Sequence, residues 1–321
     1  MRLALDRLAK LRMTTANSSI APVSVLRTLN LVTAQLDRVL SGLSAYSDAD
    51  RTLRQLAQEL TAACALSADV AVAAVLLNQI AGRYAVRHCV DTAVVASVVA
   101  QAMGKPPDEV VIIAAAALTM NVGMMRQIET FQNRSSALTP DEREIVRRHP
   151  NESAELLRNA GVTDEDWLAC VLHHHENDDG SGYPEGRPEN AIAANAKLIG
   201  LADRYCACVS ARNYRRSMLP PVALDILRRD PGHDPQLTRN FLEQLGTYPP
   251  GTLVRLANGD TGVVTAKDAL LVHALRDAEG APLAVVRNTD ALTHQISVAL
   301  HEDEARLRFS MKTVWGSLAA L

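Results

Sequence analysis

The sequence predicts a mostly α-helical protein with a small β unit near its C-terminal end. Apolar residues make up 48% of the chain but aromatic residues only 3%, so the core must be aliphatic, as in closely packed helices. Apolar positions recur every three or four residues in the first helical segment, and long apolar runs follow it. From about Tyr248 the pattern changes to short apolar runs separated by glycine-containing turns, which favours strands.

The 321 residues could form one large domain or two to three small ones. We expect an N-terminal helical segment over residues 1–64, a helical domain over residues 65–245, and a β unit with a C-terminal helix over residues 246–321. The net charge of −3 supplies no global basic field for nucleic acid. Five cysteines without a metal-type pair indicate free thiols in a reducing cytoplasm.

The sequence predicts no membrane-spanning segment. Met1 to Met13 lacks the pattern of a signal peptide. The longest nearly uncharged run, Val110 to Met125, is shorter than the ~20 residues that cross a bilayer. We therefore expect a soluble cytoplasmic protein without a membrane partner.

One apolar stripe runs through the first helical segment, which extends to about Asp48. Such a stripe is either an ordinary core face or the seam of a homodimer. A helix from Arg51 to Leu66 should follow, and a further apolar helix should run from Ser67 to Gly82. The members of the stripe are Leu29, Val32, Leu36, Leu40 and Leu43.

The next two helices carry the first candidate polar residue. We expect a helix from Tyr84 to Met103, stopped by Gly104 and two prolines, with His88 near its start. A lone histidine on an apolar helix is also typical of a hydrogen-bonded core residue. Asp108 can cap a buried helix that carries Val110 through Met125 into the interior.

A corner between two helices is predicted at His149. Thr139 begins a helix with a capping box and a proline at its first position. That helix should end near Arg148, because the residue before a proline is pushed out of the α region. Pro150 can then open another helix, which stops at Gly161. A side chain at such a corner can point into a cleft.

The chain is organised around one polar stretch, from His173 to Pro184. Thr163 should cap the apolar helix that ends in three histidines and a glutamate, and a turn rich in glycine and proline follows. Imidazole is the commonest neutral metal ligand near pH 7, and the glycines permit positive φ. The stretch predicts a helix that delivers imidazoles to a pocket floor, although a histidine run alone is often a solvated surface feature.

Ile192 to Arg212 is predicted to form one helix after this loop. Asp203 shares an apolar face with Ile199 and Cys206. A carboxylate on such a face is costly unless it is paired or bound to a cation, so Asp203 is either a metal ligand or half of a salt bridge. The basic cluster from Arg212 to Arg216 could hold a phosphate.

The last part of the chain predicts four strands. Two lie between Gly251 and Ala266 around Asn258-Gly259, the preferred dipeptide of a tight hairpin turn. Two more run from Leu270 to Leu275 and from Pro282 to Arg287. A helical stretch from about Glu302 to Leu318 should close the chain.

The eleven residues from His174 to Pro184 match the signature HHExxDGxGYP. On this motif the chain resembles the HD-GYP family, a branch of the HD-domain metal phosphohydrolases that resembles cyclic di-GMP phosphodiesterases. The resemblance covers roughly residues 65–245 and implies an HD-type helical bundle, with phosphate contacts at Arg212 and Arg215. The implied metal ligands are His88, His149, His174, His175 and Asp203. The implied GYP loop comprises Asp179, Gly180, Gly182, Tyr183 and Pro184.

The family's His-Asp pair, within an L-H-D-I-G-K stretch, is missing from this chain. The corresponding stretch here is Leu-Thr-Met-Asn-Val-Gly-Met, so Met120 and Asn121 replace the His and the Asp, and Met124 replaces the Lys. The resemblance implies that the missing Asp bridges two metal ions. An amide brings no charge to offset their repulsion, and a thioether suits neither Mn²⁺ nor Fe²⁺. We expect no intact catalytic set and no complete binuclear centre.

A single-ion site remains an alternative to a site with no metal. Three imidazoles and a carboxylate could hold one Fe, Mn, Zn or Ni ion, or they could hydrogen-bond one another around water. The four side chains in question are His149, His174, His175 and Asp203.

The expected function is that of a degenerate HD-GYP-type protein of bacterial cyclic di-GMP signalling. Its phosphodiesterase activity should be lost or strongly impaired, so that it acts by binding a nucleotide or by docking proteins such as those of the GGDEF type. One alternative is an active enzyme that cleaves cyclic di-GMP or pGpG with the remaining ligands or borrows Glu176. A second alternative is a structural homodimeric scaffold.

Overall fold

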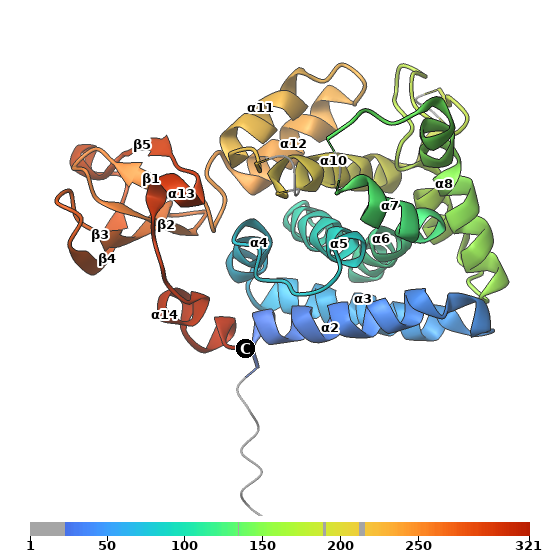
Figure 1. Ribbon diagram of the computed structural model, residues 1–321, viewed down its shortest axis with the longest axis horizontal. Helices are drawn as coiled ribbons and strands as arrows, with labels where there is room; N and C mark the ends of the chain where they lie inside the picture. Colours follow the sequence, from blue (N-terminus) through green and yellow to red (C-terminus); the bar gives the residue numbers. More distant parts are fainter. Residues whose placement is uncertain (1–22, 134, 189–190, 212–215) are drawn as a thin grey trace, which may run out of the picture.

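The computed structural model describes residues 23–321 apart from residues 134, 189–190 and 212–215. Helices dominate it, and a small antiparallel sheet stands at one side of the helical part (Figure 1). The predicted mostly α fold with a small β unit is therefore confirmed. The first helices are α2 (Val25–Ser41), α3 (Ala49–Leu66), α4 (Ala68–Leu76), α5 (Tyr84–Ala102) and α6 (Pro107–Thr119).

One apolar core joins these helices to the rest of the helical part. The α2 residues Leu29, Val32 and Leu36 are fully buried, and they belong to the same core cluster as α5 and α6. α2 and α3 run side by side along one face of the helical part (Figure 1). The apolar stripe of α2 is thus a core face of this chain.

The helix predicted over residues 110–125 ends six residues early, so the expectation of an unbroken helix was wrong. Two local features end α6 at Thr119. The Thr119 hydroxyl donates to the carbonyl of Ala115 (2.7 Å), which competes with the regular helix pattern. Gly123 then packs so closely on α8 (Pro140–Asn159) that a Cβ there would lie 2.9 Å from the Ser153 nitrogen. The chain continues as η2 (Val122–Met124) and α7 (Met125–Phe131).

The helix predicted to end near Arg148 instead runs straight through Pro150 as α8 (Pro140–Asn159). That prediction was wrong because the cost of an internal proline is partly offset here. Pro150 has no N–H, so the carbonyl of Val146 loses its helical donor, and Nδ1 of His149 donates to that carbonyl instead (2.6 Å). His149 therefore lies inside a helix and not at a corner.

Of the remaining helices in the helical part, α9 and α10 follow the predicted order with shifted ends, whereas α11 and α12 were not predicted. The cap of α9 is Asp164 and not Thr163, because the Asp164 carboxylate accepts from the Trp167 nitrogen (3.0 Å). α10 ends at Val209, before the predicted Arg212. These helices are α9 (Glu165–His173), α10 (Ala194–Val209), α11 (Pro220–Arg229) and α12 (Pro235–Leu245).

The β unit is a five-stranded antiparallel sheet in the order β4-β3-β2-β1-β5. Gly259 has φ +91° in the turn between β1 and β2, as the Asn-Gly dipeptide predicts. β5 was not predicted, since a four-residue strand leaves almost no periodic signal; it pairs with β1. The strands are β1 (Leu253–Leu256), β2 (Thr261–Ala266), β3 (Leu271–Arg276), β4 (Pro282–Asn288) and β5 (Ile296–Ala299).

The C-terminal stretch is broken into short helices and returns to the helical part. Ser24, the cap of α2, donates its hydroxyl hydrogen to the carbonyl of Leu318 (3.1 Å). The indole of Trp315 donates to the carbonyl of Thr265 in β2 (3.0 Å). These elements are α13 (Glu302–Ala305), α14 (Met311–Trp315) and η5 (Gly316–Ala319).

Within the described chain, one helical stretch is long and apolar enough to cross a bilayer. It comprises α6, η2 and α7, residues Pro107–Phe131, and 72% of its most apolar window is buried inside the protein. Burial by neighbouring helices is what the core helix of a soluble protein shows.

Candidate metal centre

His149 on α8 and His174 just after α9 point their Nε2 atoms at each other across 3.3 Å. The orientation of both rings is fixed by hydrogen bonds from their Nδ1 atoms. Nδ1 of His149 donates to the Val146 carbonyl (2.6 Å), and Nδ1 of His174 donates to the Val171 carbonyl (2.8 Å). Because each Nδ1 carries the hydrogen, each Nε2 presents a lone pair to the same point.

Two facing lone pairs without a proton between them favour a cation at that point. Ligand nitrogens about 2.0 Å from a tetrahedral ion are separated by about 3.3 Å, which matches the observed distance. His175 adds a third ring, and the ligand atoms of the three histidines all lie within 4.8 Å of one another. The histidine cluster, defined as His149, His174 and His175, therefore fits one divalent ion.

The protonation of the histidine cluster also suits a metal. Burial lowers the pKa of His149 to about 3, and burial also lowers the pKa values of His174 and His175. The rings are therefore neutral near pH 7, which is the form that binds metal. Because neither of the facing Nε2 atoms carries a hydrogen, the neutral rings of His149 and His174 cannot form a hydrogen bond with each other.

His88 and Asp203 form a separate buried pair. Nε2 of His88 lies 2.7 Å from Oδ1 of Asp203. Burial by itself would raise the pKa of Asp203, but the hydrogen bond with His88 and the nearby histidines hold that pKa well below its usual value. Asp203 is thus a carboxylate next to the cluster, bound by His88. The structure brings the five predicted ligands together as a group of three and a group of two.

One glycine lets α10 approach the cluster. A Cβ on Gly200 would lie 2.4 Å from the backbone oxygen of His174, so only glycine permits this contact. The contact sets His174 against the helix that carries Asp203. Sequence reasoning missed Gly200, although an isolated glycine inside an apolar helix is a signal of close backbone packing.

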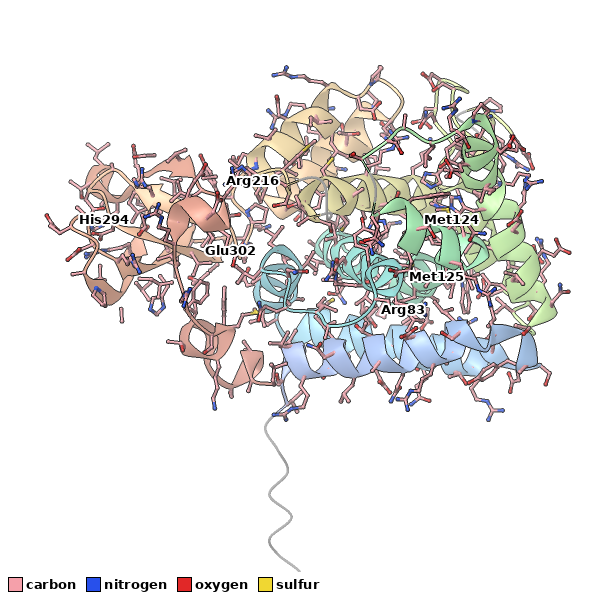
Figure 2. The ribbon with its side chains drawn as sticks, in the orientation of Figure 1. Arg83, Met124, Met125, Arg216, His294 and Glu302 are labelled. Atoms are coloured by element: carbon pink, nitrogen blue, oxygen red, sulfur yellow. The ribbon has the colours of Figure 1, made fainter. Side chains whose placement is uncertain are left out.

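Met120 and Asn121, which we expect to replace the family's His-Asp pair, lie at the turn that follows α6. Met120 is fully buried in the main core, and Asn121 is 2% exposed. The amide oxygen of Asn121 has no hydrogen-bond partner among the described residues. Met124 is also buried, where η2 packs against α8 (Figure 2). These side chains add apolar volume and one neutral amide, and no negative charge.

The GYP loop is held against the cluster by Glu176. The carboxylate of Glu176 is buried and accepts from the backbone nitrogens of Glu185 and Arg187, both at 2.8 Å. The ring of Tyr183 stacks on His175 with 4.6 Å between centroids. Both oxygens of Glu176 are therefore engaged in tethering the loop. Gly182 is required there, since a Cβ would lie 2.3 Å from the Asn177 nitrogen.

The predicted phosphate contacts Arg212 and Arg215 lie outside the described residues. The rest of the GYP loop is partly exposed to solvent. Asp179 and Ser181 are exposed, while the Asp178 carboxylate pairs with Lys197 on α10 (2.5 Å). The loop thus combines an anchored base with an exposed tip.

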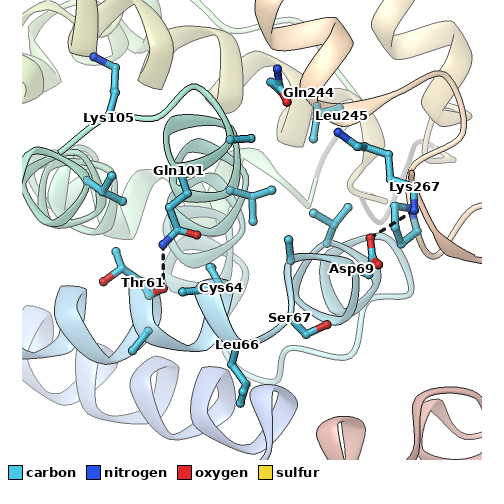
Figure 3. Close-up of a pocket in the computed structure, with 18 of the residues that line it drawn as sticks. Thr61, Cys64, Leu66, Ser67, Asp69, Gln101, Lys105, Gln244, Leu245 and Lys267 are labelled. Atoms are coloured by element: carbon cyan, nitrogen blue, oxygen red, sulfur yellow. Dashed lines mark hydrogen bonds between the residues drawn. The ribbon is translucent and has the colours of Figure 1, made fainter. Parts of the chain in front are cut away.

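A cavity lined by other helices lies away from the histidine cluster. It measures about 1000 Å³, and its lining comes mainly from α3, α4, α5, α6 and the segment after β2. Figure 3 shows Lys105 and Lys267 at opposite sides of it, with Gln101 donating to the Thr61 carbonyl between them. No residue of the histidine cluster lines this cavity, so the cluster and the cavity are separate features.

Comparisons with known proteins give the family and the fold of the chain. The family model described as HD domain matches residues 33–237. The chain is 36% identical over 150 residues to the cyclic di-GMP phosphodiesterase PA4108 of Pseudomonas aeruginosa, over 46% of this chain and 36% of that protein. It is 35% identical over 134 residues to the response regulator RpfG of Xanthomonas campestris, named a cyclic di-GMP phosphodiesterase, over 41% and 35% of the two chains.

The chain thus spans only about a third of the length of these two relatives. A third relative, a 3′3′-cGAMP-specific phosphodiesterase of Vibrio cholerae, is 31% identical over 116 residues, which cover 35% of this chain and 26% of that protein. Among solved structures, the HDG"Y"P protein Bd1817 from Bdellovibrio bacteriovorus has a TM-score of 0.56 at 15% identity, over 75% of this chain and 77% of that one. That likeness concerns the fold alone.

Proposed function

The chain belongs to the HD-domain family, in its HD-GYP branch, and on that premise we propose that it is a degenerate member acting in cyclic di-GMP signalling. In this proposal its phosphodiesterase activity is lost or strongly impaired. It acts in the cytoplasm by binding the nucleotide or a signalling protein, for example one of the GGDEF type, at the exposed tip of the GYP loop. The five cysteines are free thiols, which supports a reducing compartment.

One observation carries the proposal: the two buried positions where the resemblance implies a His and an Asp hold Met120 and Asn121. Two dications about 4 Å apart repel each other by about 17 kcal/mol at an effective dielectric constant of 20. The neutral histidine cluster and the single carboxylate Asp203 leave most of that repulsion uncompensated. A binuclear centre of the usual kind is therefore not stable here.

A single divalent ion is compatible with the residues that remain. His149, His174 and His175 would hold it, and Asp203 lies close enough to act on the same rings through its charge. Fe, Mn, Zn and Ni all accept imidazole ligands. Such an ion would supply a Lewis acid for a phosphate oxygen, while the chain's own histidines hold the ion in place.

The three converging histidines also favour the alternative, an active enzyme that works with the remaining ligands. That enzyme would have to do without Glu176, because both of its carboxylate oxygens accept backbone N–H groups of the loop. The alternative is therefore restricted to a single-ion mechanism.

The test combines metal analysis, nucleotide binding and turnover in one preparation. We expect at most one divalent ion per chain, binding of cyclic di-GMP by calorimetry, and no measurable conversion of cyclic di-GMP or pGpG with added Mn²⁺ or Fe²⁺. The matched variant carries Met120→His, Asn121→Asp and Met124→Lys, and it should bind more metal than the wild type. A His174→Ala variant is the control for loss of the cluster.

Robust turnover by the metal-replete wild type would contradict the loss of activity. The absence of both metal and nucleotide binding would leave the scaffold alternative. If the triple variant bound no more metal than the wild type, the missing negative charge at position 121 would not be what limits metal binding.

A further inference from the structure

A second concave site lies between the helical part and the β unit. It measures about 910 Å³. Four arginines line it, and we call it the arginine cavity: Arg216, Arg276, Arg306 and Arg308. Figure 2 shows Arg216 and Glu302, which also lines the cavity, where the two parts face each other. No residue of the histidine cluster lines it.

The arginine cavity carries excess positive charge. Its carboxylates are Glu302 and Asp303. Arg216 pairs with Asp303 and also lies 3.6 Å from Glu304, so the acidic side of the cavity is already occupied by one arginine. In the described chain, the other three arginines of the cavity have no ion-pair partner.

The backbone around the cavity is shaped to present these arginines. The pairing of β2, β3 and β4 shifts register between Ala274 and Arg276, and such a bulge re-aims the side chain that follows it. Leu275 instead packs into a small apolar core with Leu300 and Leu307. The bulge thus separates an inward leucine from an arginine at the rim.

Arg306 has an unusual conformation for its residue type. It ends α13 with φ +51°, a left-handed position that glycine or asparagine normally fills. Leu307 is buried, while Arg306 and Arg308 on either side of it are exposed. A glycine would be the more stable choice at Arg306, so the cost of a long cationic side chain there points to a binding role.

We propose that the arginine cavity binds a small ligand that carries two phosphate groups, such as a nucleoside diphosphate or a cyclic dinucleotide. A guanidinium fork pairs with phosphate oxygens through two parallel hydrogen bonds, and three forks without carboxylate partners exceed what one phosphate requires. The volume is within the usual range for small-molecule sites. The site is independent of the histidine cluster and of the proposed function there.

The test uses calorimetry with two probes, cyclic di-GMP and GDP, on the full chain and on a His174→Ala variant. The His174→Ala variant should retain binding at the arginine cavity. Arg276→Gln and Arg308→Gln should each weaken that binding by about 10- to 100-fold, and added salt should weaken it further. Arg255→Gln is the matched control, because Arg255 is an exposed arginine of β1 outside the cavity.

The Arg306→Gly variant distinguishes a binding role of Arg306 from a role in stability. It should raise the melting temperature by removing the left-handed arginine and at the same time weaken nucleotide binding. The probe that binds more tightly identifies the nucleotide class. The proposal is overturned if neither probe binds below about 1 mM, or if the cavity variants bind as the wild type and Arg255→Gln do.

Discussion

The two ring nitrogens of His149, and likewise those of His174, have different hydrogen-bonding roles. In His149 and His174 the Nδ1 atoms donate to backbone carbonyls, so the Nε2 atoms are left as acceptors that face each other. The geometry of these two rings thus depends on carbonyls of Val146 and Val171 that belong to the same helices. A histidine is a useful ligand here because its second nitrogen has a fixed partner.

Gly200→Ala should disturb the cluster without touching any ligand. The added Cβ would lie 2.4 Å from the His174 oxygen, so α10 or His174 must move. We expect the free energy of unfolding to fall by about 1–3 kcal/mol and the affinity for added Zn²⁺ to fall with it, both measured by titration. Gly42→Ala is the control, since its nearest neighbour would be 3.7 Å away. Equal effects in both variants would contradict the close approach.

His233 should make stability depend on pH. Burial, with Arg204 nearby, lowers the pKa of His233 to about 4, whereas in the unfolded chain it is about 6.5. The unfolded chain therefore binds a proton first as the pH falls. Stability contributed by neutral His233 is full above pH 6.5 and is lost towards pH 4, by roughly 3 kcal/mol at most.

The check on His233 is a His233→Asn variant followed by denaturant titration across this range. The wild type should lose stability relative to the variant between about pH 6.5 and pH 4. Above that range the two profiles should run parallel. A constant difference over the whole range would show that His233 is not the group responsible.

At the scale of elements, α8 carries a proline that a helix of this length normally avoids. Pro150 removes one backbone hydrogen bond, and the released Val146 carbonyl becomes the partner of His149. The helix interruption and the ligand orientation are therefore one feature. The early end of α6 places Met120 and Asn121 in the turn before η2, which packs against α8.

Pro150→Ala should weaken metal binding without lowering the stability of α8. The new N–H competes with His149 for the Val146 carbonyl, which frees the ring to rotate. We expect unfolding stability to stay level or rise while the affinity for Zn²⁺ falls by about 10-fold, measured by competition with a chelator. Pro235→Ala, at the first position of α12, should change neither affinity nor ring orientation. Unchanged affinity in Pro150→Ala would contradict this role for the carbonyl.

At the scale of the whole molecule, the C-terminal stretch ties the β unit to the first helix. Met311 and Ala319 are buried in the main core. Trp315 reaches β2 through its indole, and Ser24 at the start of α2 bonds to the Leu318 carbonyl. Residues far apart in the sequence are thereby joined in one core.

Removal of residues 310–321 should weaken the whole helical part and not only the β unit. The loss of buried Met311 alone is comparable to a large-to-small core substitution, so we expect unfolding stability to fall by about 3 kcal/mol or more. Denaturant titration followed by far-UV circular dichroism measures it. Trp315→Phe, which removes one hydrogen bond, should cost about 1 kcal/mol. A truncated chain with an unchanged midpoint would show that this contact is not structural.

Local signals explain which predictions succeeded. The cap at Thr139, the Asn258-Gly259 turn and the histidine run each depend on a few adjacent residues, and each gives its expected structure. The predicted end of a helix at Pro150 was wrong because His149 of the same helix donates to the Val146 carbonyl that the proline leaves without a donor. β5 failed because its pairing with β1 is remote in sequence.

By itself, the amino-acid sequence determined the helical class, the β unit and the order of the histidines, because residue type and spacing contain all of this. Only the tertiary structure decided that three histidines converge while His88 pairs with Asp203, that Glu176 is engaged by the loop, and that four arginines share one cavity. These are contacts between distant segments, and their geometry depends on how α8, α9, α10 and the β unit pack together.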